Sequence, residues 1–159
     1  MITLEESLKT VDGIEKLIEE DREINLAVSL NGSNDKLRSE LMPINNKYPL
    51  DKLLKAIDRY IDKSRRKVMF EYIMIKGIND SNKNALELLK IVRNRLCFVN
   101  LIPCNPIGEK FQPSSNERIK EFRDISEKGK VTVTQRYLFG DDISAACGQL
   151  AGEKGRNYK

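Results

Sequence analysis

Residues 49–75 read PLDKLLKAIDRYIDKSRRKVMFEYIMI, and the spacing of apolar residues changes once within this stretch. After Pro49, apolar residues recur at the i, i+3, i+4, i+7 spacing of an amphipathic helix. They are Leu50, Leu53, Leu54, Ile57, Tyr60 and Ile61. Residues 68–75 are then continuously apolar, β-branched and aromatic apart from one glutamate, which predicts a strand. A helix that leads directly into a buried strand is typical of a parallel α/β sheet.

The chain before this stretch carries the same alternation. Residues 11–23 have a helical apolar stripe, and residues 25–30 (NLAVSL) are short and apolar, which predicts a buried strand. A polar loop follows over 31–35. One or two helical turns are predicted over 35–41, and Pro43 ends them.

The chain after it continues in the same way. Asp80 or Ser81 caps a helix that runs to Val92 with Leu86, Leu89 and Val92 on its apolar face, and residues 97–102 predict a third strand. Ser114 and Glu117 fit a capping box, which predicts the start of the next helix. Its inward residues are Ile119, Phe122 and Ile125, and Gly129 ends it. Residues 131–137 predict a last or edge strand. Strands separated by helices indicate parallel crossovers.

Ligands of parallel α/β proteins meet the carboxyl ends of the strands. At those ends lie residues 29–31, 76–80, Asn105, and 137–142 with Cys147 beyond. The hydroxyl of Ser29 and the amides of Asn31 and Asn105 are suited to hold a ribose or an amino-acid group; the alternative is ordinary turn chemistry. Glu71, inside the second strand, is a candidate buried acid that can also face outward or pair with a lysine.

Composition limits the classes of function. The chain has 159 residues, a formal net charge of +4 and no histidine, which nearly excludes a zinc site. The mild positive charge permits a nucleic-acid partner without requiring one. No apolar run approaches the roughly 18 residues of a membrane span, and no export signal is visible. Three widely spaced cysteines, Cys97, Cys104 and Cys147, indicate a reducing compartment and do not form a cluster motif of their own.

Residues 139–152 read FGDDISAACGQLAG and place Cys147 among small residues. Small neighbours let a ligand approach the sulfur closely, so a thiol placed there can be a nucleophile if its thiolate is favoured. The alternative is an inert buried cysteine at a glycine turn. Asp141 and Asp142 in the same stretch are read as a turn and a cap rather than as acid–base catalysts.

The motif AACGQLAG, preceded by GDDI, resembles the C-terminal motif of the radical S-adenosylmethionine (SAM) methyltransferases that modify C2 of an adenine in 23S ribosomal RNA and in some transfer RNAs. Residues 26–50, 68–81 and 99–106 fit the same family. The resemblance implies an α/β fold, the C-terminal part of a radical-SAM (β/α)6 partial TIM barrel with parallel strands and crossover helices. Residues 1–152 would form the C-terminal half of the methyltransferase core and 153–159 a flexible tail.

The resemblance also implies the site residues and the reaction. Ser29, Leu30, Asn31 and Asn105 match positions that contact SAM, although Asn31 stands where the family has histidine. Cys147 matches the catalytic methyl carrier. One SAM methylates this thiolate, and a second SAM on a [4Fe–4S] cluster is reductively cleaved to a radical that takes a hydrogen from the S-methyl group. The S-methylene radical adds to adenine C2, and a second cysteine releases the product by forming a disulfide.

Several parts of the family pattern are absent from these 159 residues. The CxxxCxxC cluster motif, the glycine-rich SAM-binding stretch, the resolving cysteine and the N-terminal RNA-binding domain do not occur, and the serine-threonine-glycine strand end expected near 6–9 is not recognisable. We therefore expect a C-terminal half that is inactive alone, lacks ligands for the cluster, and requires an N-terminal half or a second copy. An unpaired apolar sheet edge would favour self-association or instability.

The implied setting is cytoplasmic and away from membranes. The expected partners are 23S rRNA, tRNA and an electron donor such as flavodoxin. Two other functions stay open. One is a non-catalytic α/β module that binds RNA or a nucleotide, and the other is a relative that methylates C8 of the same adenine.

Overall fold

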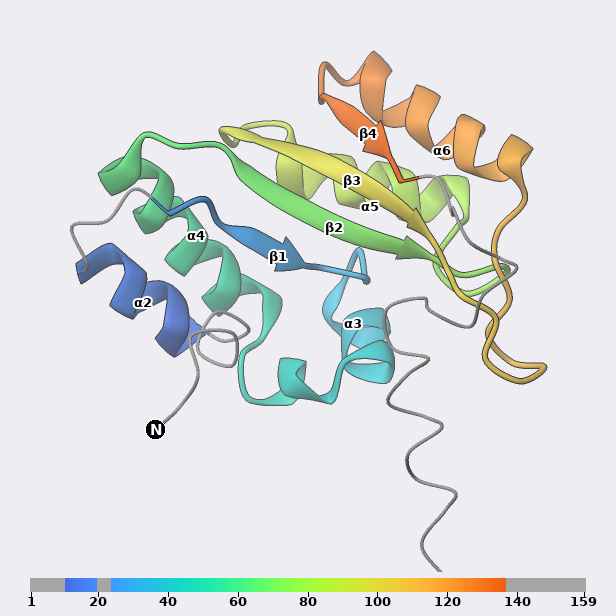
Figure 1. Ribbon diagram of the computed structural model, residues 1–159, viewed down its shortest axis with the longest axis horizontal. Coiled ribbons are helices and arrows are strands. Elements are labelled where there is room, and N and C mark those ends of the chain that lie inside the picture. Colours follow the sequence, from blue (N-terminus) through green and yellow to red (C-terminus); the bar gives the residue numbers. More distant parts are fainter. Residues whose placement is uncertain (1–10, 20–23, 137–159) are drawn as a thin grey trace, which may run out of the picture.

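The computed structural model describes residues 11–19 and 24–136, and its strands form one parallel sheet with helices between them (Figure 1). The elements in chain order are α2 (Val11–Glu19), β1 (Ala27–Ser29), α3 (Asp35–Leu41), the 3-10 turn η1 (Pro43–Asn46), α4 (Leu50–Ser64), β2 (Val68–Met74), α5 (Asn82–Val92), β3 (Cys97–Pro103), α6 (Asn116–Lys128) and β4 (Val133–Gln135). The predicted alternation of helices and strands is confirmed.

The four strands lie in the sheet in the order of the sequence. β1 pairs with β2, β2 with β3 and β3 with β4, all in parallel. The central pair is the longest, since all seven residues from Val68 to Met74 match Cys97 to Pro103. Strands that follow one another in space as in sequence are the arrangement of a parallel barrel, so the α/β fold class is confirmed.

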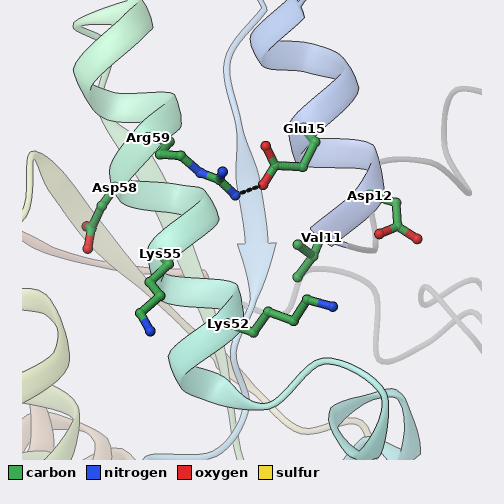
Figure 2. Close-up of a pocket in the computed structure, with 7 residues that line it drawn as sticks. All are labelled: Val11, Asp12, Glu15, Lys52, Lys55, Asp58 and Arg59. Atoms are coloured by element: carbon green, nitrogen blue, oxygen red, sulfur yellow. Dashed lines mark hydrogen bonds and ion pairs between the residues drawn. The ribbon is translucent and has the colours of Figure 1, made fainter.

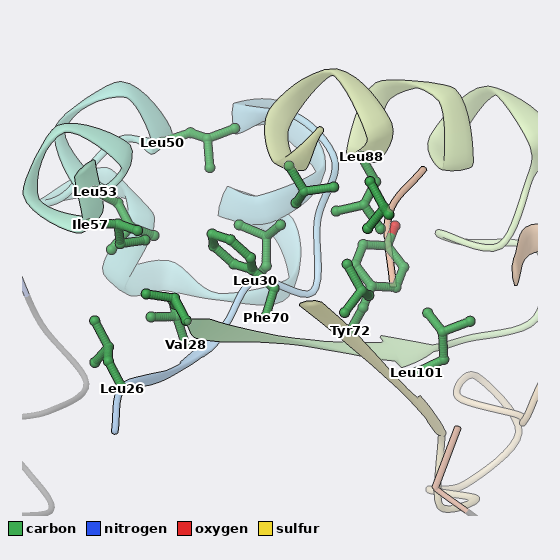
Figure 3. Packing of buried hydrophobic residues seen from close by; sticks show 14 of the residues in the cluster. Leu26, Val28, Leu30, Leu50, Leu53, Ile57, Phe70, Tyr72, Leu88 and Leu101 are labelled. Carbon is green, nitrogen blue, oxygen red and sulfur yellow. The ribbon is translucent and has the colours of Figure 1, made fainter. Parts of the chain in front are cut away.

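One face of the sheet packs against the helices and forms the core. Alternate residues of β2 are fully buried, namely Val68, Phe70, Tyr72 and Met74. Figure 3 shows Phe70 and Tyr72 on the side of the sheet where Leu53 and Ile57 of α4 and Leu88 of α5 lie. The Tyr72 ring also lies 5.3 Å from that of Phe122 on α6, measured between centroids. We call this side the helix face and the other side the inner face.

Two helices differ in detail from their predicted form. The buried residues of α5 are Ala85, Leu88 and Val92, whereas Leu86 is 52% exposed, so its predicted place on the apolar face is wrong. The side chain of Ser115, not Ser114, caps α6 by accepting from the Arg118 N–H at 3.3 Å. α5 thus buries Ala85 and Leu88 in place of Leu86, and α6 begins one residue later than predicted.

The ends of the other elements agree more closely with the sequence prediction. Ser81 caps α5, Gly129 ends α6, and Ile119, Phe122 and Ile125 point into the core as predicted. Pro43 ends α3 and also begins η1. The predicted tail at 153–159 lies outside the described residues. None of the helices over 11–19 and 24–136 is long and apolar enough to span a bilayer.

Candidate functional site

Three loops leave the carboxyl ends of β1, β2 and β3, and buried hydrogen bonds fasten them together. Asn79, fully buried in the loop after β2, donates to the carbonyls of Asn31 at 3.0 Å and Ile73 at 2.7 Å. Asp80 accepts from the Gly77 N–H at 3.0 Å and from the Ser114 hydroxyl at 2.8 Å. Because the loops are tied to each other through buried polar groups, this edge of the sheet is a preorganised surface.

Ser29 ends β1 on the inner face and is exposed. Its hydroxyl donates a 3.0 Å hydrogen bond to Oε2 of Glu71, its partner in register on β2. The same register continues to Asn100 on β3 and Thr134 on β4, where the Thr134 hydroxyl donates to Oδ1 of Asn100 at 3.0 Å. These four residues form a polar line across the sheet, which we call the inner polar row.

The next two predicted residues have different surroundings. Leu30 is fully buried, so its side chain faces the core and only its backbone is near the strand end. Asn31 adopts a left-handed conformation with φ of 53°. Its side-chain oxygen accepts from the Ile73 N–H at 3.0 Å, and its side-chain nitrogen donates to the Met42 sulfur at 3.5 Å. The Asn31 carboxamide therefore extends the pairing between β1 and β2.

Asn105 lies in the loop directly after β3 and is half-buried. Among the described residues its carboxamide has no hydrogen-bond partner, while its carbonyl accepts from the Cys104 thiol at 3.1 Å. An amide that is held at a strand end and not used by the fold is available to a ligand as both donor and acceptor. Ser29 and Asn105 thus belong to the same edge of the sheet, on strands separated by β2.

The cysteines within 11–19 and 24–136 do not form a metal site. Cys97 begins β3 at the opposite edge of the sheet, where burial raises its pKa to about 11 against a smaller opposing effect of Arg95. Burial also raises the pKa of Cys104. No group of three metal-ligating side chains occurs in this part of the chain, so it does not fit a [4Fe–4S] cluster. Cys147 lies outside the described residues.

A second set of hydrogen bonds holds the loop that follows Asn31. The Glu87 carboxylate on α5 accepts from Ser33 Oγ at 2.7 Å and from Asn34 Nδ2 at 2.8 Å. These two donors lower the pKa of Glu87. Asn84 adds a 3.1 Å bond to the Ser33 hydroxyl. The loop after β1 is thereby anchored to a helix more than 50 positions away in sequence.

A surface groove of about 600 Å³ lies between α2 and α4, on the helical layer (Figure 2). Of its charged lining residues, Asp12 accepts from the Tyr48 hydroxyl, and Lys52 Nζ lies 5.0 Å from the centre of the Tyr48 ring. The other four form ion pairs within the protein: Arg59 with Glu15, Lys55 with Asp51, and Asp58 with Arg95. Side chains that neutralise each other in this way do not indicate a charged ligand. The candidate site is therefore the carboxyl edge of the sheet and not this groove.

Sequence reasoning missed Asn79 and left Glu71 with three open readings. Glu71 is half-buried and paired with Ser29, and no lysine pairs with it among the described residues. The period-two alternation of β2 was the available signal, because it places Glu71 on the face opposite Phe70 and Tyr72. No comparable signal distinguishes Asn79 from any other loop asparagine.

No protein-family model matches the chain. Curated relatives do match it. It is 47% identical over 149 residues to a probable dual-specificity RNA methyltransferase RlmN of Caldicellulosiruptor saccharolyticus, which covers 93% of this chain and 42% of that protein. It is 45% identical over 141 residues to the protein of the same name from Caldanaerobacter subterraneus, covering 88% of this chain and 41% of that one. The chain thus spans about two fifths of the length of these relatives.

Solved structures give the same picture. The structure of a radical SAM methyltransferase from Sphaerobacter thermophilus superposes with a TM-score of 0.85 at 46% identity, over 89% of this chain and 42% of that one. A domain of pyruvate-formate lyase-activating enzyme from Bacteroides vulgatus superposes with a TM-score of 0.62 at 16% identity, which is a likeness of fold alone.

Proposed function

We propose that this chain forms the part of a radical SAM RNA methyltransferase that binds SAM at the carboxyl ends of its strands. The chain is homologous to about two fifths of the length of the relatives named RlmN. The proposed reaction is methylation of C2 of an adenine in 23S rRNA and tRNA. The alternative target is C8 of the same adenine, and the experiment below distinguishes the two.

One observation carries the proposal. Ser29 and Asn105, which match SAM-contacting positions of the family, occupy the carboxyl edge of one parallel sheet, where ligands of this architecture bind. Both side chains are accessible, and the loops that carry them are fixed by Asn79 and Asp80. Leu30 and Asn31 would contribute through their backbone, because the Leu30 side chain is in the core and the Asn31 carboxamide bonds to Ile73 and Met42.

These polar groups fit SAM, whose ribose hydroxyls and amino-acid end need hydrogen-bonding partners. When bound in this family, SAM supplies a methyl group and, on reduction, a radical. The residues of this chain bind and orient it. On the resemblance of its motif to the family, we assign the methyl-carrying thiol to Cys147. Burial raises the pKa of Cys97, at the opposite edge of the sheet, and of Cys104.

The described part of the chain does not fit an iron–sulfur cluster, so the proposal assigns cluster binding to a segment that carries CxxxCxxC and acts together with this chain. An RNA partner follows from the names of the relatives. A reduced electron carrier of the flavodoxin type is the proposed electron donor.

The test is co-expression of this chain with an N-terminal RNA methyltransferase segment that carries CxxxCxxC, in bacteria that lack adenine-C2 methylation of 23S rRNA. The proposal expects 2-methyladenine in the RNA and an S-methyl adduct on Cys147, both found by mass spectrometry and both abolished by Cys147→Ala. Methylated RNA with an unmodified Cys147 would exclude the carrier role. 8-Methyladenine would change the assigned target, and unmethylated RNA in the presence of a folded complex would overturn the proposal.

A further inference from the structure

The carboxylate of Glu71 is the anionic member of the inner polar row. Glu71 shares the inner face of β2 with Met69 and Ile73, which are half-buried and apolar. One oxygen, Oε2, accepts from Ser29, and Oε1 has no partner within the described residues. No cation forms an ion pair with the carboxylate in that part of the chain. An acid held on an apolar strand face, with one oxygen unused, is a binding group rather than a stabilising ion pair.

The bond to Ser29 also decides what Ser29 can do. A serine hydroxyl has one proton and two lone pairs. The proton of Ser29 is donated to Glu71, so the hydroxyl can only accept from a ligand. Glu71, when ionised, likewise only accepts. The two side chains therefore form a pair of acceptors whose oxygens, Ser29 Oγ and Glu71 Oε2, lie 3.0 Å apart.

This arrangement selects the chemical group that binds. Two adjacent acceptors, one of them anionic, match two adjacent donors, and they repel a carboxylate. The two hydroxyls of a ribose are on neighbouring carbons and can each donate one hydrogen bond. An acidic side chain that accepts from ribose hydroxyls is also the means by which dinucleotide-binding folds hold a ribose. The other half of the row differs in charge, because Thr134 and Asn100 are both neutral and the Asn100 carboxamide carries a donor nitrogen beside its acceptor oxygen.

We propose that Glu71, together with Ser29, binds the ribose diol of SAM. This inference rests on the proposed function and adds to it a residue, Glu71, and an orientation of the ligand. The ribose lies over the β1–β2 pair. Asn105, which follows β3, would then contact a part of SAM other than the ribose.

The test is a set of NMR titrations of the full 159-residue chain, which detect weak binding. The probes are SAM, adenosine, 2′-deoxyadenosine and 3′-deoxyadenosine, and the variants are Glu71→Gln and the control Glu40→Gln. Glu40 is exposed on α3 and undergoes the same change of charge. Glutamine keeps the length of Glu71, and a thermal melt verifies that each variant is folded.

The wild-type chain is expected to bind adenosine more tightly than either deoxy analogue. Glu71→Gln is expected to weaken SAM binding by about tenfold or more, the value of a hydrogen bond to a charged group, and to reduce the preference for adenosine over the deoxy analogues. Glu40→Gln is expected to match the wild type. If Glu71→Gln binds SAM as the wild type does and retains the preference for the diol, this inference is overturned while the proposed function stands. If the folded wild-type chain binds no SAM, this inference is overturned, and the co-expression experiment decides the proposed function separately.

Discussion

The side chain of Asn79 donates a 3.0 Å hydrogen bond to the main-chain carbonyl of Asn31, 48 positions earlier in the chain. The same side chain donates to the Ile73 carbonyl and accepts from the Ile75 N–H at 2.8 Å. Asn31 in turn accepts from the Ile73 N–H. The ends of β1 and β2 are thus joined by two asparagines that bond to backbone groups, and this joint supports the Ser29–Glu71 pair.

Replacing Asn79 with alanine is expected to lower the free energy of unfolding by about 3 kcal/mol. The change leaves buried backbone groups without partners, and each such group costs roughly 1–3 kcal/mol. Urea denaturation followed by circular dichroism measures the loss. Asn94→Ala, at an exposed turn, is the matched control and should change stability by less than about 0.5 kcal/mol. Equal effects of the two substitutions would show that the Asn79 joint does not stabilise the fold.

The register of α5 can be tested with two leucines on that helix. Leu88 is fully buried and Leu86 is 52% exposed. Leu88→Ala is expected to cost about 2–5 kcal/mol, because it removes core contacts and leaves a cavity. Leu86→Ala should be nearly neutral, since alanine favours helix and the side chain lies in solvent. If chemical denaturation showed a larger loss of unfolding free energy for Leu86→Ala than for Leu88→Ala, Leu86 would belong to the buried face, as the sequence alone predicts.

Glu87 is expected to make stability depend on pH. Its pKa is lowered in the folded chain because Ser33 and Asn34 donate to the carboxylate. The stabilisation is therefore fully present above the ordinary glutamate pKa, and it is lost as the pH falls through the lower folded value. The difference in urea midpoint between the wild type and Glu87→Gln should be large at pH 7 and small at pH 3. If the difference in urea midpoint stayed constant from pH 7 to pH 3, the Glu87 carboxylate would not be the source of the pH dependence.

Cys97 is expected to resist alkylation in the folded chain. Burial raises its pKa to about 11, so at pH 8 its thiolate fraction is about 100-fold below that of an ordinary thiol. Iodoacetamide labelling followed by peptide mass spectrometry measures the rate. The rate should rise with pH and increase sharply in urea, where the burial is lost. Labelling of Cys97 at the same rate in native and urea-treated samples would contradict its burial.

The order and direction of the strands follow from the sequence. The change from helical spacing to a continuous apolar run in residues 49–75, repeated on either side, is enough to predict parallel β/α units. It also predicts that Ser29 and Asn105 lie at one edge of the sheet, because parallel strands have their carboxyl ends together.

The finer placement of side chains was not predictable in the same way. Nothing near Ser114 in sequence shows that its hydroxyl bonds to Asp80 while the next residue, Ser115, caps α6. Ala85 is too small to stand out in an apolar pattern, yet it is fully buried in α5 while Leu86 faces solvent. These positions depend on packing between elements that are distant in the chain.

The sequence by itself therefore determined the parallel α/β architecture, since backbone periodicity and turn residues are local properties. Only the tertiary structure decided that Glu71 meets Ser29, that the Asn31 carboxamide bonds to the backbone of β2, and that Asn79 joins the two strand ends. The partners in these contacts are 42 to 48 positions apart, and the register that brings them together is set by the packing of Phe70 and Tyr72 under the helices.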